Sequence, residues 1–316
     1  MPQTELHRHL DVSVRLTTLL ELAKKQGKTG SSTSLEEFGR KVYLRDPMRT
    51  LAEVLDTFTL FQKVLDKPET LERVAYEVVE DCYNEGTRRV ELRFSPSFAC
   101  ETSGMPWEAA LASFENGIAR ARKKFPDIEV GLICIASRDY GPEPVAETVD
   151  FFLKNRNRFV ALDLAGNEAG FPCKLFEEAF RPAVKAGAPI TVHAGEGAGP
   201  ENIWAAIEYL GARRIGHGIS CVQDPKLLQE LQRRQICLEM CPTSNWITQA
   251  VKQIEEHPLP KVLRAGIPVC INTDDPGVFG VTLPHEKNLC RTRMGMSEAE
   301  IQMTDDHAFR FSFLNS

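Results

Sequence analysis

Histidine and acidic residues follow four short apolar runs of the chain. They are His7 and His9 in ELHRHLD, His193 and Glu196 in VHAGE, His217 in GHG, and Asp274 and Asp275 in TDDP. Neutral imidazoles and a carboxylate are ligands that suit Zn²⁺ and similar first-row ions. Three histidines and one aspartate would leave one position for a water, whose pKa falls towards 7 on such an ion. These residue types therefore predict a metal site that activates water.

Hydrolysis on such a site also needs groups that move protons. His217 lies between two glycines, so the backbone there can approach a substrate, and Glu196 comes three residues after a candidate ligand. We take His217 as the candidate base and Glu196 as the candidate acid. A two-metal hydrolase usually needs a further bridging ligand, often a lysine on the fourth strand. The stretch ALDLAGNEAG has no lysine, so one metal ion is expected.

Strands of a parallel barrel would bring these four motifs to one place. Runs rich in Val, Ile and Leu occur at 3–7, 88–94, 128–136, 158–165, 189–194, 213–218, 235–240 and 267–272. Helical patterns occur at 69–86, 106–124, 143–155, 174–186, 200–211, 225–234 and 259–265. This order predicts an α/β protein, a (β/α)₈ TIM barrel, whose active site forms at the C-terminal ends of the strands. Side chains alternate along a strand, so His7 and His9 would both point into the barrel.

The surplus length points to an insertion. A typical barrel has about 250 residues, and this chain has 316. The extra residues fall between the first two strands, roughly at 12–87, a stretch that contains GKTGSSTS. We predict one domain over 1–316, with extra helices of this insertion forming a lid. An open doubly wound sheet is the alternative, but a dinucleotide-binding one would need a Gly-rich phosphate turn, and none follows an early strand.

Composition narrows the partners and the compartment. The formal net charge is −6, which argues against nucleic acid as the main partner. No apolar run reaches the roughly 18 residues of a membrane span, and no signal-peptide pattern opens the chain, so we expect a cytoplasmic protein. The nine cysteines are odd in number and several lie in apolar runs, so we expect reduced, buried thiols. Cys241 in MCPTSN is expected to pack, while Ser244 and Asn245 bond a ligand-bearing loop.

The motifs ELHRHLD, LDLAGNE, TVHAGE, RIGHG, MCPTSN and INTDDP together resemble those of the adenosine deaminases of the amidohydrolase superfamily, over nearly the whole chain. The resemblance implies hydrolysis of adenosine or 2′-deoxyadenosine to inosine or 2′-deoxyinosine and ammonia, by a monomer or homodimer. It implies one Zn²⁺ per subunit, held by His7, His9, His193 and Asp274.

The resemblance also implies catalytic roles. Glu196 would protonate purine N1, or share a proton with it, and so make C6 electrophilic. His217 would handle the attacking water. Asp275 would orient that water and meet purine N7.

The same resemblance implies the substrate contacts. The Gly166 amide would face N3, Asp11 would bind the ribose 5′-hydroxyl, and His9 would stand beside the substrate as well as the metal. An aspartate at position 11 resembles the nucleoside enzymes, because a carboxylate accepts from a hydroxyl and repels a phosphate. The family usually has Gly and a small residue next, whereas this chain has Val12 and Ser13. The alternative is therefore a deaminase of a 5′-modified adenosine, such as 5′-methylthioadenosine or aminofutalosine.

Two other classes of protein are weighed. One is an amidohydrolase that acts on a different amine or amide, and LDLAGNE together with HAGE argues against it. The other is a catalytically inactive barrel kept as a binding module, which should have lost a ligand or the glutamate. Every expected position is filled.

Overall fold

The computed structural model describes residues 3–48, 54 and 57–315. Its parallel strands are β1 (Gln3–His9), β2 (Thr87–Phe94), β3 (Glu129–Ser137), β4 (Ala161–Ala165), β5 (Thr191–Ala194), β6 (Arg214–His217), β7 (Cys237–Met240) and β8 (Val269–Ile271). They form two four-stranded sheets, β1-β2-β3-β4 and β5-β6-β7-β8. A bridge between Leu162 and Ile190 joins the sheets on one side, and a bridge between Arg8 and Asp274 joins them on the other. The predicted eight-stranded barrel is confirmed.

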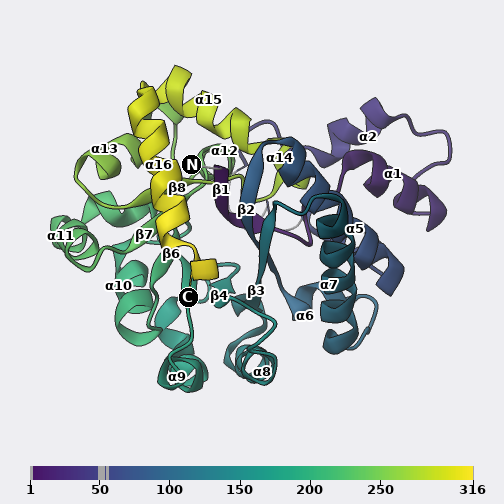
Figure 1. The fold of residues 1–316 in the computed structure, drawn as a ribbon, viewed down its shortest axis with the longest axis horizontal. Helices are drawn as coiled ribbons and strands as arrows, with labels where there is room; N and C mark the ends of the chain where they lie inside the picture. The colour runs from purple at the N-terminus through teal and green to yellow at the C-terminus, as the bar shows by residue number, and fades with distance from the viewer. Residues whose placement is uncertain (1–2, 49–53, 55–56, 316) are drawn as a thin grey trace.

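A ring of helices covers the strands (Figure 1). It consists of α5 (Pro68–Asn84), α7 (Trp107–Lys124), α8 (Pro142–Lys154), α9 (Glu177–Lys185), α10 (Pro200–Tyr209), α11 (Pro225–Arg234), α13 (Leu259–Arg264) and α16 (Glu298–Phe311). α5 shows why they form: Pro68 fits its first turn, and Leu71, Val74 and Val78 recur at helical spacing and are buried. The seven predicted helices all lie in this ring.

Additional helices lie between β1 and α5. They are α1 (Leu16–Lys25), α2 (Leu35–Val42) and α4 (Thr59–Val64). Ser34 caps α2 by accepting from the Glu37 N–H. α5 itself packs against α7 in the outer ring, so the helices that are additional to the barrel end before Pro68. Residues 49–53 and 55–56 of the predicted lid lie outside the described residues.

The sequence analysis made no prediction for a further set of mostly short elements. The α-helices are α6 (Pro96–Glu101), α12 (Pro242–Ile247), α14 (Pro276–Phe279) and the longer α15 (Leu283–Met294). The 3₁₀ turns are η1 (Arg138–Tyr140), η2 (Cys173–Phe176), η3 (Ile219–Gln223), η4 (Ile254–Glu256) and η5 (Phe313–Asn315).

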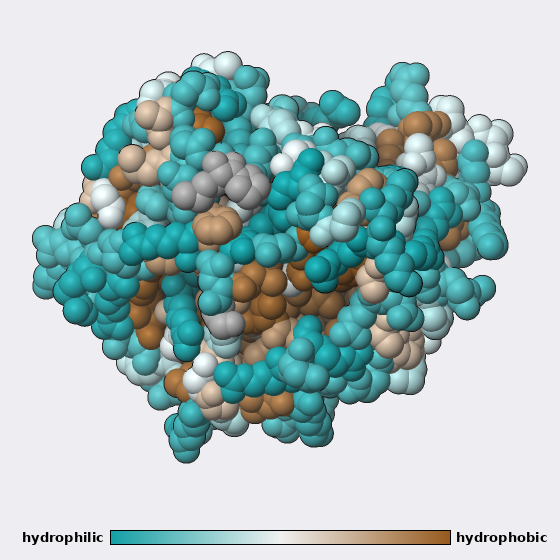
Figure 2. Space-filling model, in the orientation of Figure 1, coloured by the Kyte–Doolittle hydropathy of each residue, from teal (hydrophilic) through white to brown (hydrophobic). Residues whose placement is uncertain are grey.

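The cysteines agree with the sequence analysis. All nine cysteines are buried and free, as predicted. Among the described helices, none is both long and apolar enough to cross a bilayer. Figure 2 shows a mainly hydrophilic face with apolar side chains gathered beside β3. A hollow there is lined by Val130, Leu132, Phe159 and Val160, at the N-terminal ends of β3 and β4 and therefore on the side away from the strand-end motifs.

Candidate active site

The closure of the barrel places the histidine pair His7 and His9 beside the acid pair Asp274 and Asp275. The His9 N–H donates to the Asp274 carbonyl at 2.9 Å, and the Asp274 N–H donates to the His7 carbonyl at 3.1 Å. The Asn272 amide oxygen accepts from the Leu6 N–H at 2.9 Å. Asp274 has a φ of 63°, a left-handed conformation that is costly for a residue with a Cβ and is often found at functional sites. The backbone thus aims this carboxylate at the histidines of β1.

The predicted ligand side chains meet in one buried cluster. The ligand atoms of His7, His193, His217 and Asp274 all lie within 4.8 Å of one another, and Asp274 also belongs to a group with His9 and Asp275. Asp274 Oδ1 lies 3.1 Å from His7 Nε2 and 3.2 Å from His9 Nε2. His9 Nε2 lies 3.3 Å from His193 Nε2. Two overlapping groups therefore share Asp274, and together they contain six side chains that could contact a cation.

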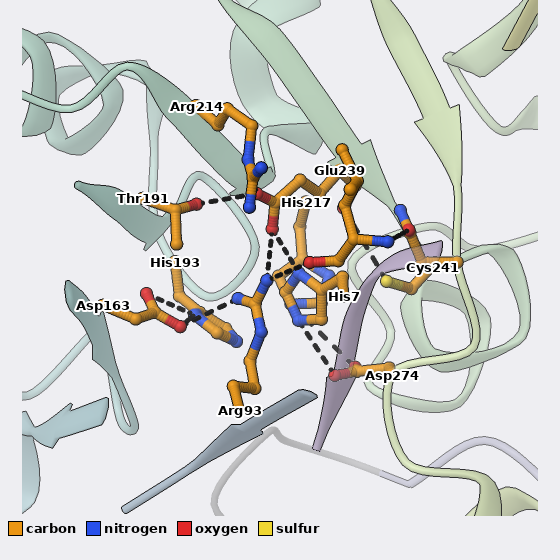
Figure 3. A network of polar contacts seen from close by, with 12 residues as sticks. His7, Arg93, Asp163, Thr191, His193, Arg214, His217, Glu239, Cys241 and Asp274 are labelled. Carbon is orange, nitrogen blue, oxygen red and sulfur yellow. Dashed lines mark hydrogen bonds and ion pairs between the residues drawn. The ribbon is translucent and has the colours of Figure 1, made fainter. Parts of the chain in front are cut away.

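A second layer of charged side chains orients two of these histidines (Figure 3). Glu239 Oε2 lies 2.8 Å from His7 Nδ1, and Asp163 Oδ2 lies 3.1 Å from His193 Nδ1. Arg93 bridges the two carboxylates, at 2.8 Å from each. A carboxylate on Nδ1 leaves Nε2 of a neutral imidazole free to bind a metal. His7 and His193 are therefore held in the tautomer of a metal ligand.

Hydrogen bonds give His217 the opposite tautomer. The Leu259 N–H donates to His257 Nδ1 at 3.2 Å, so His257 carries its proton on Nε2, which lies 3.2 Å from Asn245 Oδ1. The Cys241 N–H also donates to this oxygen. The amide nitrogen of Asn245 consequently faces His217 Nδ1, at 2.9 Å. A neutral His217 then accepts at Nδ1 and carries its proton on Nε2. It therefore presents a hydrogen-bond donor, Nε2–H, towards the cavity.

The glycine before His217 leaves room for two of the other histidines. A Cβ on Gly216 would lie 3.0 Å from His7 Cε1 and 3.3 Å from the His193 Cα. His217 itself has a φ of 61°. The GHG sequence therefore lets three imidazoles pack against one another, with the His193 and His217 ring centroids 5.1 Å apart.

Burial and neighbouring charges fix the protonation of the cluster. Burial lowers the pKa of His193 to about 3, so its imidazole is neutral. Burial also disfavours a charged His9, but Asp275 and Asp274 outweigh this and raise its pKa to about 9. Burial raises the pKa of Asp275 well above its ordinary value, and the adjacent Asp274 carboxylate raises it further. A divalent cation among these groups would replace the proton on His9.

Glu196 lies beside His217. Its side chain is only 8% exposed, and its Oε2 lies 3.5 Å from His217 Nε2. The Thr248 hydroxyl donates to Oε1 at 3.0 Å. Burial, with a smaller effect from the charge of Asp274, raises the pKa of Glu196 to about 8. This carboxyl group is therefore protonated at neutral pH and can act as an acid.

Two adjoining cavities open on the cluster. The first, about 50 Å³, is lined by Glu196, His217 and Asp275, and the second, about 220 Å³, by Asp11 and Val12. They share the lining residues His9, Phe58, Ala165 and Gly166.

The second cavity is lined by three of the four residues that were predicted to contact the substrate, namely His9, Asp11 and Gly166, whereas Asp275 lines the first. Gly166 has a φ of 112°, and a Cβ there would lie 1.8 Å from Asp139 Oδ2, so only glycine fits. Asp11 is buried and accepts from the Ser95 N–H at 3.1 Å. Val54 and Phe58, from the segment that precedes α5, line the first cavity, so this insertion covers part of the site.

The two cavities are lined by every predicted site residue except one. The exception is His7, which belongs to the buried histidine–aspartate cluster. The sequence analysis missed the groups that orient them, namely Asp163, Glu239, His257 and Arg93. The available signal was a charged residue inside an otherwise apolar strand, as in ALDLA and CLEM. Asn245 was predicted to bond a ligand-bearing loop, and it bonds His217 instead.

Comparisons with known proteins agree with this arrangement. A family model described as adenosine deaminase matches residues 2–316. Adenosine deaminase of Pectobacterium atrosepticum is 38% identical over 315 residues, which cover 100% of this chain and 93% of that protein. The crystal structure of an adenine deaminase from Arthrobacter aurescens superposes with a TM-score of 0.90 at 28% identity, over 99% of this chain and 94% of that chain.

A zinc-containing structure is also similar. An amidohydrolase from Burkholderia ambifaria, solved with bound zinc, superposes with a TM-score of 0.89 at 27% identity, over 99% of this chain and 86% of that chain. The family model and the relatives span the motifs from ELHRHLD to INTDDP. The chain belongs to the adenosine deaminase family.

Proposed function

We propose that this enzyme hydrolyses adenosine and 2′-deoxyadenosine to inosine and 2′-deoxyinosine, releasing ammonia. Hydrolysis of a C–N bond follows from the family; the substrate and the metal are the proposal. The observation that carries it is the convergence, on one small cavity, of a histidine–aspartate cluster, Glu196 with its raised pKa, and the Asp275 side chain, whose Oδ1 has no hydrogen-bond partner among the described residues.

We propose one Zn²⁺ per subunit, held by His7, His9, His193 and Asp274. The fit is tested by His7 Nε2, which is buried, faces the Asp274 carboxylate and makes no well-formed hydrogen bond among the described residues. Asp274 Oδ1 is 3.1 Å away, and two carboxylates fix the tautomers of His7 and His193. Imidazole nitrogens with one carboxylate suit zinc better than calcium or magnesium, which prefer oxygen ligands. When bound, the ion would supply Lewis acidity that lowers the pKa of the attacking water.

Glu196 would give its proton to purine N1. Protonation of N1 withdraws electrons from C6, which then accepts the oxygen of water. The hydrogen bond from Thr248 to Oε1 leaves Oε2 to face the substrate and His217.

His217 and Asp275 would hold the attacking water between them. In this proposal the Nε2–H of His217 would donate to the water oxygen, so Asp275 would act as the base in place of His217. Asp275 Oδ1 is buried without a hydrogen-bond partner among the described residues and accepts a proton from the water. Asp275 then passes that proton to the 6-amino group, which leaves as ammonia, while the new C6 hydroxyl returns a proton to Glu196. The 6-oxo purine remains, with its proton on N1.

The second cavity would hold the ribose. Among its described lining residues are three carboxylates, of Asp11, Glu101 and Asp139, and neither lysine nor arginine. Such a lining favours a 5′-hydroxyl over a 5′-phosphate, because a phosphate needs cationic partners. A nucleoside is therefore the better substrate than a nucleotide.

The alternative substrate, a 5′-modified adenosine, has one observation in its favour. Beside Asp11, the cavity is also lined by Val12, Phe98 and Tyr140, which could pack against an apolar 5′ group. A methylthio group would gain from this contact, whereas a hydroxyl would gain from Asp11.

A side-by-side deamination assay tests the proposal, with zinc measured on the same sample. The substrates are adenosine, 2′-deoxyadenosine, 5′-methylthioadenosine, aminofutalosine, AMP and adenine. We expect adenosine and 2′-deoxyadenosine to give the highest kcat/KM. A preference for 5′-methylthioadenosine or aminofutalosine would favour the alternative, and a preference for adenine or AMP would refute both.

A further inference from the structure

One buried carboxylate has no part in the proposed function. It contacts the loop that carries Glu196. Glu168 follows β4 in the LDLAGNE motif, and it is only 2% exposed. Its two carboxylate oxygens accept four consecutive backbone N–H groups. These are Gly195 at 2.6 Å, Glu196 at 3.0 Å, Gly197 at 2.8 Å and Ala198 at 3.2 Å.

The loop needs such a partner because of its shape. Residues 195–198 lie between the end of β5 and the start of α10 at Pro200, so their N–H groups have no strand or helix to bond. Gly195 has a φ of 76°, and a Cβ there would lie 2.5 Å from Ile203 Cδ1 and 2.6 Å from Ser220 Oγ. Four successive N–H groups that converge on one point form an anion-binding concavity. Here the anion is part of the protein.

The hydrogen bonds that Glu168 accepts act directly on Glu196, the proposed acid. Glu168 binds the backbone N–H of Glu196 and of both of its neighbours, while Thr248 holds the far end of the Glu196 side chain. Glu196 is thus fixed at its main chain and at its carboxyl group. A change at Glu168 would release the first of these two anchors.

We propose that Glu168 is a positioning residue for Glu196. It shapes the loop after β5 so that the carboxyl group of Glu196 meets N1 of the purine. This role rests on the proposed function, because it assumes that Glu196 delivers the proton. Glu168 itself lines neither of the two cavities and belongs to neither group of candidate metal ligands.

The test is Glu168→Gln, with Glu201→Gln as the matched control. Glutamine cannot accept from all four N–H groups, because one of its two positions carries hydrogens. Glu201 is exposed and accepts a single N–H, from Gly199 in the same loop, at 3.2 Å. Displacement of a catalytic group by about 1 Å can reduce the rate about 100-fold. We expect kcat on adenosine to fall about 10- to 100-fold in Glu168→Gln, with KM changed less than about 3-fold and bound zinc unchanged. Glu201→Gln should match the wild type.

A double-mutant cycle separates positioning from a general structural role. In a Glu196→Gln background, Glu168→Gln should reduce kcat by less than about 2-fold, since the group that it positions is already disabled. A full and additive loss in that background would overturn the proposal. If Glu168→Gln does not fold, Glu168→Asp, which keeps the charge but shortens the reach, replaces it in the same cycle.

A readout without substrate completes the test. Amide hydrogen exchange at 195–198 should be faster in Glu168→Gln than in the wild type and in Glu201→Gln, and equal rates would overturn the proposal. An active wild type with unchanged kcat in Glu168→Gln would refute only the positioning role. A wild type that is inactive on every purine tested would refute the proposed function and this role together.

Discussion

The carboxylate of Glu239 joins the proposed metal site to the interior of the barrel, and its replacement by glutamine should damage both. It is fully buried. It accepts from Arg93 Nη2 at 2.8 Å, from Arg214 Nε at 2.6 Å and from the Thr191 hydroxyl at 2.9 Å, and it lies 2.8 Å from His7 Nδ1. Burial would raise its pKa, but the two arginines outweigh burial and hold it well below its ordinary value.

These contacts set the expected loss of stability and of zinc affinity in Glu239→Gln. Glu239→Gln leaves two buried guanidinium groups short of one negative charge, and loss of one partner from a buried ion pair costs about 3–5 kcal/mol. At about 2 °C per kcal/mol for a large domain, the midpoint of thermal unfolding should fall by roughly 6–10 °C. His7 also loses the carboxylate that fixes its tautomer, so zinc affinity should fall about 10- to 100-fold.

Two measurements check this prediction. Thermal unfolding of the metal-free proteins isolates the ionic network, and competition with a chelator gives the zinc affinity. Glu129→Gln is the control, because Glu129 pairs with Arg89 at 2.5 Å but its side chain is 54% exposed. An exposed pair contributes less than about 1 kcal/mol. A midpoint within about 2 °C of the wild type, with unchanged zinc affinity, would show that Glu239 does not have this role.

Four further predictions concern single side chains. Asp274→Ala should lose bound zinc together with activity, and a fully metallated variant would remove Asp274 from the ligand set. Glu196→Gln should keep its zinc and lose about 10²- to 10⁴-fold in kcat. The raised pKa keeps the Glu196 carboxyl group protonated below about pH 8, so the wild-type rate should decline above that pH. The variant should lack this decline. Asn245→Leu should reduce kcat about 10-fold without loss of zinc, since Nδ1 of His217 loses its donor, and an unchanged rate would show that the amide does not set the tautomer. Asp11→Asn should impair adenosine more than free adenine, and equal losses would contradict the 5′-hydroxyl contact.

The fold could be predicted because the strands repeat one simple pattern. Runs of branched apolar residues mark strands that are covered on both faces, and all eight predicted runs contain a strand. Their ends were less well predicted. The run at 158–165 begins three residues before β4, which starts at Ala161. α16 was also missed, since its apolar stripe is narrow and only Ile301, Thr304 and Ala308 are buried.

The inner part of the site could be predicted from residue type, whereas its support could not. Histidines and acids at strand ends indicate chemistry by themselves. Asp163, Glu239 and Glu168 indicate little in sequence, because their roles depend on partners between 25 and 232 residues away. His257 lies in a loop with no motif around it, yet it sets the tautomer of His217 through Asn245.

The division of the barrel into two sheets has a consequence for how the protein holds together. His7 and His9 belong to the first sheet, whereas His193 and Asp274 belong to the second half of the chain. A cation held by all four would cross-link the two four-stranded sheets. Its binding energy would stabilise the protein only after the two sheets have packed together. Removal of the cation by a chelator should therefore destabilise the two bridges that join the sheets, Leu162–Ile190 and Arg8–Asp274, before either sheet unfolds.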